Sequence, residues 1–454
     1  MAVTGPPPAA PTVAHAGILR RQSLRESAAR TYARSLPIVP VRARGLTIEG
    51  ADGQRYLDCL SGAGTLALGH NHPVVLDAIR KVLDSGAPLH ALDLATPVKD
   101  AFTTELFATL PLEFAAKAKV RFCGPTGTDA VEAALALVRI ATGRGGILSF
   151  TGGHHGMTAG ALAVSGGAED VRVTRLPYPY DYRCPFGVGG ERGAELAARW
   201  TENLLDDPEG GVPAPAGMVL EPVQGEGGVI PAPDAWLRRM RGITADRSIP
   251  LIVDEVQTGV GRTGAFWAVE HSGITPDVMV MSKAIGGSLP LAVIVHHEDL
   301  DLRPPGAHAG TFRGNQLAMA AGAATLAYVR ENELAARAAV LGARMLGQLQ
   351  GLAAHHPCVG DVRGRGLMIG VELVAPAAGD PAPPDPALAA AVQQECLSRG
   401  LIVELGGRQG AVVRLLPPLT LTDEQAVAVL DRFADALAAA ERAALRRTEP
   451  GPSS

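Results

Sequence analysis

The feature that most constrains the fold is a series of short apolar runs that alternate with helical patterns between residues 120 and 295. Each run is long enough for a buried strand and too short for a helix. Strands that alternate with helices favour a mostly parallel sheet with helices on both faces. We therefore expect an α/β fold with a mostly parallel central sheet in a large domain, and core strands at residues 120–123, 147–150, 218–221, 251–254, 278–282 and 291–295.

The pattern changes beyond these runs. Residues 315–330 form a long Ala-rich helical pattern, and shorter strand patterns at 367–373, 401–404 and 412–416 are interleaved with helices. This order is typical of a separate small α+β domain, whose last helix is expected to start at the capping-box pattern Thr-Asp-Glu-Gln (422–425). The expected division of the chain is a disordered tail over 1–16, an N-terminal segment that joins the small domain over 17–70, a large domain over 71–330, a C-terminal small domain over 331–445 and a second disordered tail over 446–454.

Composition and charge exclude several classes of protein. With 47% hydrophobic and 19% charged residues, the 454-residue chain is typical of globular proteins and not of disordered ones. Its formal net charge of -5 is small for this length, so the sequence shows no electrostatic footprint for nucleic acid or an anionic membrane surface. The least polar helical pattern, residues 317–329, is too short to span a bilayer. The expected partners are small molecules and a second copy of the chain.

Cysteine usage and the start of the chain indicate the compartment. The five cysteines are few, odd in number and never spaced C-x-x-C, so neither a disulfide framework nor a zinc knuckle is expected. Residues 1–17 are Ala/Pro-rich and lack the basic and apolar regions of a signal peptide. We therefore expect a cytoplasmic protein.

A carboxylate and a lysine stand at the ends of two of the expected strands. Asp254 closes the apolar run 251–253, and Lys283 follows the run 278–281. Ligand groups gather at the carboxyl ends of parallel strands, so the two side chains are expected to meet. Pyridoxal phosphate (PLP) needs a lysine amine that holds it as a Schiff base and an anion that keeps its ring nitrogen protonated. The pair therefore suggests a PLP site.

A Gly-rich turn follows the first expected strand. Residues 123–133 run from a strand through Gly-Pro-Thr-Gly-Thr into a helix, and Gly127 and Thr128 stand at the start of that helix. Backbone amides at a helix start, helped by Thr hydroxyls, form an anion site that suits the cofactor phosphate. A plain turn between a strand and a helix also uses Gly and Thr. The turn is not a Walker loop, because no Gly-Lys-Ser/Thr follows.

Two further segments leave alternatives open. His154 and His155 in the loop 152–158 are candidates for metal ligands, ring-stacking groups or loop residues, but no carboxylate or Cys lies at ligand spacing, so no metal is expected. Residues 259–264 match G-x-G-x-x-G, and a dehydrogenase that binds nicotinamide there is the rival interpretation. Residues 254–257 separate these glycines from their strand and no helix pattern follows, so a turn-rich loop is favoured.

Over residues 21 to 437 the ordered motifs carry a family resemblance. They are the segments 124–128, 152–158, 221–228, 254–264, 282–287 and 310–315. With these motifs the chain resembles the class III PLP-dependent aminotransferases of fold type I. Within that class it is similar to the diaminobutyrate aminotransferases that take 2-oxoglutarate, used in siderophore, diamine and ectoine pathways; the segments behind this narrower resemblance are 122–134, 176–187 and 308–319.

The resemblance implies roles for the cofactor-binding residues. Lys283 would hold PLP and shuttle a proton, and Asp254 would keep the ring nitrogen protonated. Gln257 would hydrogen-bond the ring hydroxyl, and Gly127 and Thr128 would bind the phosphate in the large domain. The counterpart of Thr311 in this class reaches the phosphate of the neighbouring subunit, so a homodimer with a shared active site is implied. His154 stands where the family usually has an aromatic side chain stacked on the ring.

The resemblance also implies the substrates. Arg414 would grip the carboxylate of glutamate or 2-oxoglutarate, and Glu226 would pair with it when a substrate presents an amine without a neighbouring carboxylate. The expected reaction converts L-glutamate and L-aspartate 4-semialdehyde to 2-oxoglutarate and L-2,4-diaminobutyrate in two ping-pong half reactions. The alternatives are another ω-amine transaminase, acting on ornithine, 4-aminobutyrate or a related diamine, a decarboxylase of the same fold, or a binding protein without cofactor.

Overall fold

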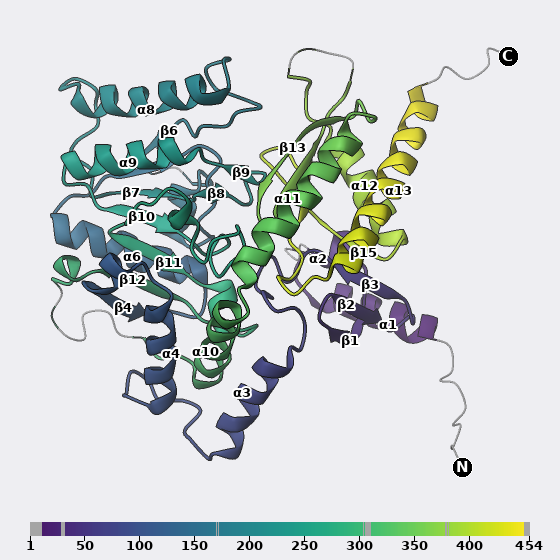
Figure 1. Cartoon of the computed structure of the whole chain (residues 1–454), viewed down its shortest axis with the longest axis horizontal. Coiled ribbons are helices and arrows are strands. Elements are labelled where there is room, and N and C mark those ends of the chain that lie inside the picture. Colours follow the sequence, from purple (N-terminus) through teal and green to yellow (C-terminus); the bar gives the residue numbers. More distant parts are fainter. Residues whose placement is uncertain are drawn as a thin grey trace.

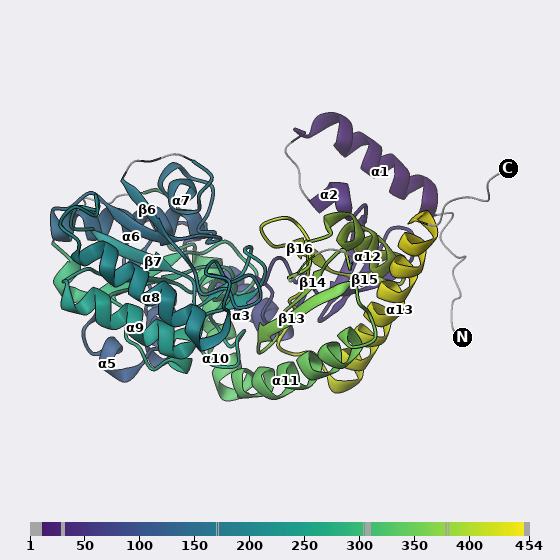
Figure 2. The same ribbon diagram turned by 90° about the horizontal axis from the view of Figure 1, so that it is seen from above.

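The computed structural model describes residues 11–28, 32–168, 170, 172–302, 304, 310–376, 379 and 381–448. A large domain built on one sheet lies beside a smaller domain that contains both the N-terminal strands and the C-terminal helix (Figure 1). Figure 2 shows the two domains side by side, with α11 (Leu334–Ala353) running along the edge of the smaller one.

The large domain is organised around a seven-stranded sheet. Its strands lie in the order β4-β12-β11-β10-β7-β5-β6, and all run parallel except β12, which is antiparallel to both of its neighbours. The strand bounds are β4 (Ala118–Phe122), β5 (Ile147–Phe150), β6 (Val173–Leu176), β7 (Gly217–Leu220), β10 (Leu251–Asp254), β11 (Val278–Met281) and β12 (Val293–His297). The α/β fold with a mostly parallel central sheet is confirmed.

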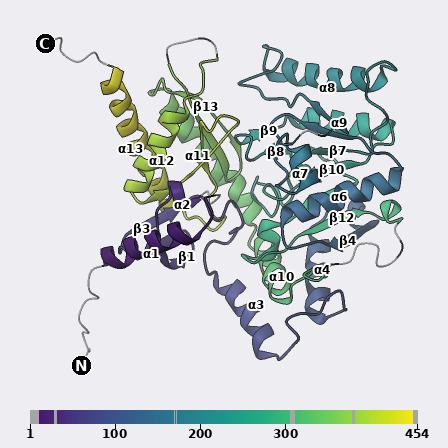
Figure 3. The same cartoon turned by 180° about the vertical axis from the view of Figure 1, so that it is seen from behind.

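Successive residues of the central strands pack into two separate cores. Ile252 packs with α6 (Gly127–Thr142) on one face of the sheet, whereas Leu251 and Val253 pack with the α9 (Asp234–Asp246) side chains on the other. This alternation follows from the pleat of a strand, and it explains why the run is apolar throughout. Figure 3 shows α6 and α7 (Ala159–Val164) on the face opposite α8 (Gly190–Asp206) and α9.

All six expected core strands are present, with ends that differ by at most two residues from the prediction. The sequence did not indicate β6, because Thr174 and Arg175 interrupt its apolar run at the partly exposed edge of the sheet. The reversed direction of β12 was not foreseen either. The remaining helices of this domain are α3 (Pro73–Asp84), α4 (Pro97–Ala108), α5 (Leu112–Ala115) and α10 (Gln316–Glu331), with short turns η1 (Ala268–His271), η2 (Lys283–Gly286) and η3 (Glu298–Leu300) and a hairpin of β8 (Val223–Gln224) and β9 (Ile230–Pro231).

The smaller domain combines the two ends of the chain. One sheet has the antiparallel order β13-β14-β17-β16, and a second has the order β1-β2-β3-β15, in which β15 pairs in parallel with β3. The elements are α1 (Pro11–Arg25), α2 (Tyr32–Ser35), β1 (Pro40–Arg44), β2 (Thr47–Gly50), β3 (Arg55–Asp58), β13 (Val359–Arg365), β14 (Met368–Leu373), α12 (Pro386–Ser398), β15 (Leu401–Ile402), β16 (Glu404–Gly406), β17 (Val412–Leu415) and α13 (Asp423–Thr448).

The helices at the two ends are longer than the sequence suggested. Helix α1 begins at Pro11, inside the segment 1–16 that was expected to be disordered, and α13 continues to Thr448, into the expected tail 446–454. Proline suits the first position of a helix, and the Ala-rich end of α13 consists of strong helix formers. The rest of both tails lies outside the described residues. The capping box before α13 is present, because Thr422 and Gln425 exchange hydrogen bonds of 3.0 and 3.2 Å.

The glycine motif 259–264 is a turn that joins the two domains. Arg262 is buried in it and donates to the carbonyl oxygens of Leu367, at 3.0 Å, and Pro417. A side chain on Gly264, whose φ is +95°, would collide with Ala339 of α11 at 2.9 Å. The turn is therefore packed against protein and leaves no room for a dinucleotide, which contradicts the dehydrogenase alternative. Among the described helices, none combines the length and the apolar character that crossing a membrane requires.

Candidate active site

A cavity of about 300 Å³ opens at the carboxyl edge of the large sheet. Eight of the residues singled out in the sequence line it, namely Gly127, Thr128, His154, His155, Glu226, Asp254, Gln257 and Lys283. A larger hollow, of about 690 Å³, lies between strand β13 and the loop that follows β6. It contains none of these residues and no lysine, so the smaller cavity is the site at which chemistry is expected.

Asp254 ends β10 with a carboxylate that points into this cavity. The side chain is buried, and it accepts hydrogen bonds from His155 Nδ1 at 2.8 Å and from the amide of Val256 at 3.0 Å. Burial lowers the pKa of His155, but its hydrogen bond to Asp254 outweighs that effect, so the net pKa of the imidazole is raised. The hydrogen bond from His155 therefore holds the Asp254 carboxylate in place. The sequence had left the role of His155 open.

Lys283 lies two residues after the end of β11 and begins the short turn η2 in a left-handed backbone conformation with φ of 49°. Its side chain lies along the cavity wall, so the residue retains some surface, but protein surrounds it on most sides. This burial is the largest influence on the amine and lowers its pKa, while the carboxylates of Glu226 and Asp254 oppose the change. The unprotonated amine is the form that reacts with carbonyl compounds and accepts protons, and a lowered pKa increases its share.

The start of α6 forms a cradle at one end of the cavity. The first amides of a helix have no partner one turn back, so they can meet an anion. At Gly127 a side chain would approach Val256 to 3.1 Å, and at Gly156, where φ is +123°, it would collide with Thr128. The Thr128 and Thr158 hydroxyls are hydrogen-bonded at 2.6 Å. The two glycines therefore keep the space open in front of the helix start.

His154 and Glu221 form another wall. The amide of His154 donates to Glu221 at 2.9 Å, which fixes the loop after β5 against the end of β7. Burial lowers the pKa of His154, so its ring is neutral at neutral pH and faces the cavity. Burial raises the pKa of Glu221 to about 7, and the amide of Gly225 donates to the same carboxylate at 2.9 Å. Glu221 therefore connects the loop after β5 with the β8–β9 turn through its hydrogen bonds to His154 and Gly225. The sequence did not reveal this role.

Gln257 is buried between the cavity and the N-terminal segment. Its amide nitrogen donates to the carbonyl oxygen of Ala63 at 3.2 Å. Its side-chain oxygen is buried, and no described residue donates a hydrogen bond to it. A buried polar atom without a partner costs free energy, so this oxygen marks a place where a ligand hydroxyl fits.

Arg414 lies behind Glu226 at the boundary between the domains. It is fully buried on β17, and its Nη2 donates to both Glu226 oxygens at 2.9 Å. The same nitrogen lies 2.7 Å from a carboxylate oxygen of Glu404 on β16, a residue that the sequence did not single out. Burial raises the pKa of Glu226, but the attraction of Arg414 outweighs it, so the net pKa is lowered and the pair is charged.

Thr311 does not line the cavity. It is exposed in a turn before α10, next to Phe312, whose side chain is also exposed. The structure thus brings together the expected cofactor and substrate residues of one chain, and it leaves Thr311 on the surface.

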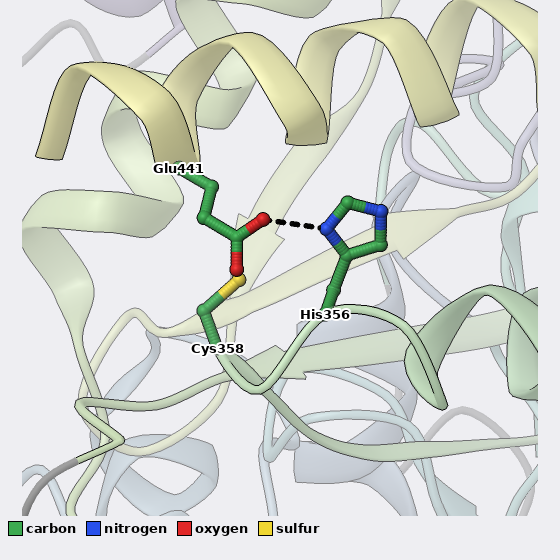
Figure 4. Close-up of side chains that lie close together, drawn as sticks. All are labelled: His356, Cys358 and Glu441. Carbon is green, nitrogen blue, oxygen red and sulfur yellow. Dashed lines mark hydrogen bonds and ion pairs between the residues drawn. The ribbon is translucent and has the colours of Figure 1, made fainter. Parts of the chain in front are cut away.

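A second group of titratable side chains lies in the smaller domain, away from this cavity. Figure 4 shows His356, Cys358 and Glu441 close together, with a hydrogen bond between His356 and Glu441. The His356 Nδ1 atom lies 2.6 Å from the Glu441 carboxylate. Among the described residues these three are the set of possible metal ligands that lie close together. Burial and the Glu441 carboxylate raise the pKa of the Cys358 thiol to about 12. The hydrogen bonds of the group tie α13 to the turn before β13, and the absence of a metal stays a prediction.

Comparison with known proteins identifies relatives of the whole chain. A model of the family described as aminotransferase class-III matches residues 28–437. The chain is 54% identical over 435 residues to the diaminobutyrate--2-oxoglutarate aminotransferase of Rhizobium meliloti (strain 1021), covering 93% of this chain and 92% of that protein. It is 48% identical over 427 residues to the protein of the same name from Haemophilus influenzae, covering 91% and 93%.

Solved structures agree with the fold. An amine transaminase from an uncultivated Pseudomonas species, in its PLP-bound form, matches with a TM-score of 0.81 and 31% identity, over 91% of this chain and 97% of that one. An (S)-enantioselective omega-transaminase from Thermomicrobium roseum matches with a TM-score of 0.83 and 26% identity, over 94% and 98%. The family that the motifs indicated is confirmed by these matches.

Proposed function

The chain belongs to the class III aminotransferases, and from that premise we propose that it holds PLP on Lys283 and exchanges an amino group between two substrate pairs. One pair is L-glutamate and 2-oxoglutarate, and the other is L-2,4-diaminobutyrate and L-aspartate 4-semialdehyde. The observation that carries the proposal is the buried Glu226–Arg414 pair at the edge of the cavity that contains Lys283. The names of the relatives at 54% and 48% identity support the same substrates.

The residues present fit PLP. The cavity offers an amine of lowered pKa, the anionic Asp254, a helix start kept open by glycines, and the unpartnered oxygen of Gln257. These groups match the aldehyde, ring nitrogen, phosphate and ring hydroxyl of PLP respectively. When bound, PLP supplies a ring that withdraws electrons from the substrate carbon that loses its proton. His154 and Val256 also line this cavity and would contact the ring.

Lys283 would hold the cofactor until a substrate amine displaces it, and then move a proton between two carbon atoms. Burial lowers the pKa of this amine, which increases the share of the unprotonated form that both tasks need. Asp254, braced by His155, would keep the ring nitrogen protonated. The remaining cavity residues would bind and orient the cofactor and the substrate.

The Glu226–Arg414 pair would let one site accept two kinds of amine. A substrate with a carboxylate beside its amine, such as glutamate, needs the guanidinium, whose fork meets a carboxylate with two bonds. Glu226 must then leave Arg414. The terminal amine of diaminobutyrate has no neighbouring carboxylate, so Glu226 stays in place. Another ω-amine transaminase of the class, acting on ornithine, 4-aminobutyrate or a related diamine, would use the same pair, and the relatives' names favour diaminobutyrate over it.

The proposed working form is a homodimer in which Thr311 binds the phosphate held by the neighbouring subunit. Phe312, beside Thr311, and Met157, at the cavity, have exposed side chains, 73% and 71% accessible, that fit an apolar contact between copies. Mixing inactive Lys283→Ala subunits with Thr311→Ala subunits is expected to restore activity, because one site of each hybrid is intact. No restoration in hybrids shown to form would contradict the shared site.

An absorption spectrum tests the function directly. The purified protein is expected to show a visible cofactor band that both L-glutamate and L-2,4-diaminobutyrate bleach. Bleaching by glutamate but not by diaminobutyrate would contradict the second substrate and leave the aminotransferase. The absence of a band after addition of PLP would contradict the roles of Lys283 and Asp254.

A further inference from the structure

Arg414 has two carboxylate partners, and they differ in how they are held. Glu404 stands on β16 directly across from Arg414 on β17, in register within one antiparallel sheet. Glu226 lies in the β8–β9 turn of the large domain and reaches Arg414 across the domain boundary. A cross-strand neighbour keeps its place as long as the sheet does. Glu404 is thus the fixed partner and Glu226 the one that can leave.

The nitrogen atoms of the Arg414 guanidinium differ in whether they have a hydrogen-bond partner. Both carboxylates lie against Nη2, whereas Nε and Nη1 of Arg414 are buried without a hydrogen-bond partner among the described residues. The Glu404 oxygen that faces Arg414 also lacks a hydrogen bond of good geometry. Buried donors and acceptors of this kind are costly unless something pairs with them. The unpaired Nε and Nη1 of Arg414 could therefore bind one more carboxylate.

Tyr32 contacts the Glu404 carboxylate at the oxygen that does not face Arg414. Its hydroxyl donates to Glu404 Oε1 at 2.8 Å from helix α2, in the N-terminal segment. The charged groups that face Glu404 are Arg414 on β17, Glu226 in the β8–β9 turn and Lys283 on η2. Burial raises the pKa of Glu404 and Glu226 raises it further, while Arg414 and the Tyr32 hydrogen bond lower it. With two carboxylates on one guanidinium, any added anion increases an excess of negative charge.

We propose, on the basis of the function given above, that Glu404 is a positioning and specificity-determining residue: it stays beside Arg414 when a substrate carboxylate displaces Glu226, and it takes up one proton from solvent as this happens. Glu226 leaves Arg414 but stays in the wall of the cavity, so the incoming carboxylate adds one negative charge to the group of Arg414, Glu404 and Glu226, and the proton removes that charge. No proton is needed when the terminal amine of diaminobutyrate enters, because Glu226 then remains on Arg414. Glu404 therefore weakens the binding of glutamate relative to diaminobutyrate as the pH rises.

Calorimetry with glutarate measures this proton. Glutarate has the carboxylates of glutamate without its amine, so its own ionisation does not obscure the result. The holoenzyme is titrated between about pH 6 and pH 9 in buffers of different ionisation enthalpy, which gives the protons taken up per glutarate bound. Wild-type protein is expected to reach nearly one proton, and its dissociation constant to rise by up to about tenfold per pH unit over that window.

Glu404→Gln keeps the shape of the side chain and removes the charge. It is expected to lose the proton uptake and to bind glutarate roughly three- to tenfold more tightly at the upper end of the pH range. Tyr32→Phe removes a hydrogen bond to the charged form of Glu404, so the uptake is expected to move to higher pH. Tyr32 is half-exposed, and this variant provides the test should Glu404→Gln fail to fold. Glu331→Gln, at the exposed end of α10, removes the same charge outside the site and should match the wild type.

Unchanged proton uptake in Glu404→Gln would overturn the inference, because another group, such as His154, would then be the acceptor. Equal changes in the Michaelis constants for glutamate and diaminobutyrate would also overturn it, since they would indicate a purely structural role. Failure of the proposed function looks different. The wild-type holoenzyme would then not be bleached by glutamate, whatever the behaviour of the Glu404 and Tyr32 variants.

Discussion

The two halves of the candidate active site are built in different ways. In the large domain, Asp254 ends β10 and Lys283 lies just beyond the end of the adjacent parallel strand β11, so the sheet alone brings them together. In the smaller domain, Arg414 and Glu404 face each other across an antiparallel pair, and they meet the cavity only through Glu226. The first half carries the groups for chemistry on any amine. The second carries the groups that distinguish one amine from another.

Variants that change residues of only one half test this division of roles. A change in the strand-end residues should affect glutamate and diaminobutyrate alike. A change in the arginine cluster should affect glutamate more. A variant of either half that behaves like the other would contradict the division.

The largest effect is expected for Lys283→Ala. The variant loses both the attachment point of the cofactor and the proton carrier, so turnover of both amines should fall by at least about 10³-fold. Steady-state rates with each amine and the visible spectrum of the purified variant are the measurements. A variant that kept turnover within tenfold of the wild type would show that Lys283 is not the reacting amine.

Asp254→Asn comes next. The amide retains the shape and can still contact His155, but it cannot hold the ring nitrogen protonated, and turnover of both amines should fall by about 10²- to 10⁴-fold. Rates with the two amines are compared after saturation with PLP, so that weaker cofactor binding does not contribute. A loss confined to one of the two amines would contradict the placement of Asp254 in the chemical half.

Arg414→Lys tests the other half. Lysine keeps the charge but lacks the planar fork, so the Michaelis constant for glutamate is expected to rise by about 10- to 100-fold. The constant for diaminobutyrate should change by less than about threefold, because its terminal amine leaves the Glu226 pair intact. Parallel kinetics with the two amines measure the split, and equal losses for both would count against the selective role.

The smallest effect is expected at His154. Because burial lowers the pKa of His154, the ring is neutral at neutral pH and becomes charged only in acid. A charged ring stacks less well on a protonated cofactor, so PLP affinity should fall as the pH drops through that lowered pKa. His154→Tyr should remove this acid dependence and change PLP affinity by less than about tenfold. Cofactor titrations over a pH series check it, and an unchanged profile would mean that His154 does not cover the ring.

The same division decides how much could be predicted from the sequence. A short apolar run that ends in Asp254 or is followed by Lys283 locates a strand end, and strand ends of a parallel sheet converge, so local pattern was sufficient there. Glu404 and Tyr32 were missed because their placement depends on the register of β16 with β17 and on a contact between residues 372 positions apart. No local pattern encodes either. The sequence singled out His155, but its hydrogen bond to Asp254 links the loop after β5 to the end of β10, 99 positions away in the chain.

The fold shows the same limit. Strands buried on both faces were found because they are apolar throughout, as in β10 and β11. Strand β6 was missed because an edge position tolerates Arg175, and the direction of β12 is set by how the chain returns to the sheet, which its own residues do not determine. Domain packing, which places Arg262 and Arg414 at the boundary, also follows only from the assembled structure.

Transfer of labelled nitrogen from L-glutamate to L-aspartate 4-semialdehyde tests the proposed substrate pair most directly. The holoenzyme is first converted with ¹⁵N-labelled L-glutamate, freed of small molecules, and then given L-aspartate 4-semialdehyde. We expect one equivalent of L-2,4-diaminobutyrate per active site, with the label in the 4-amino group, and none from Lys283→Ala. Labelled enzyme that does not pass its nitrogen to the semialdehyde, but does pass it to another aldehyde, would contradict the proposed substrate pair.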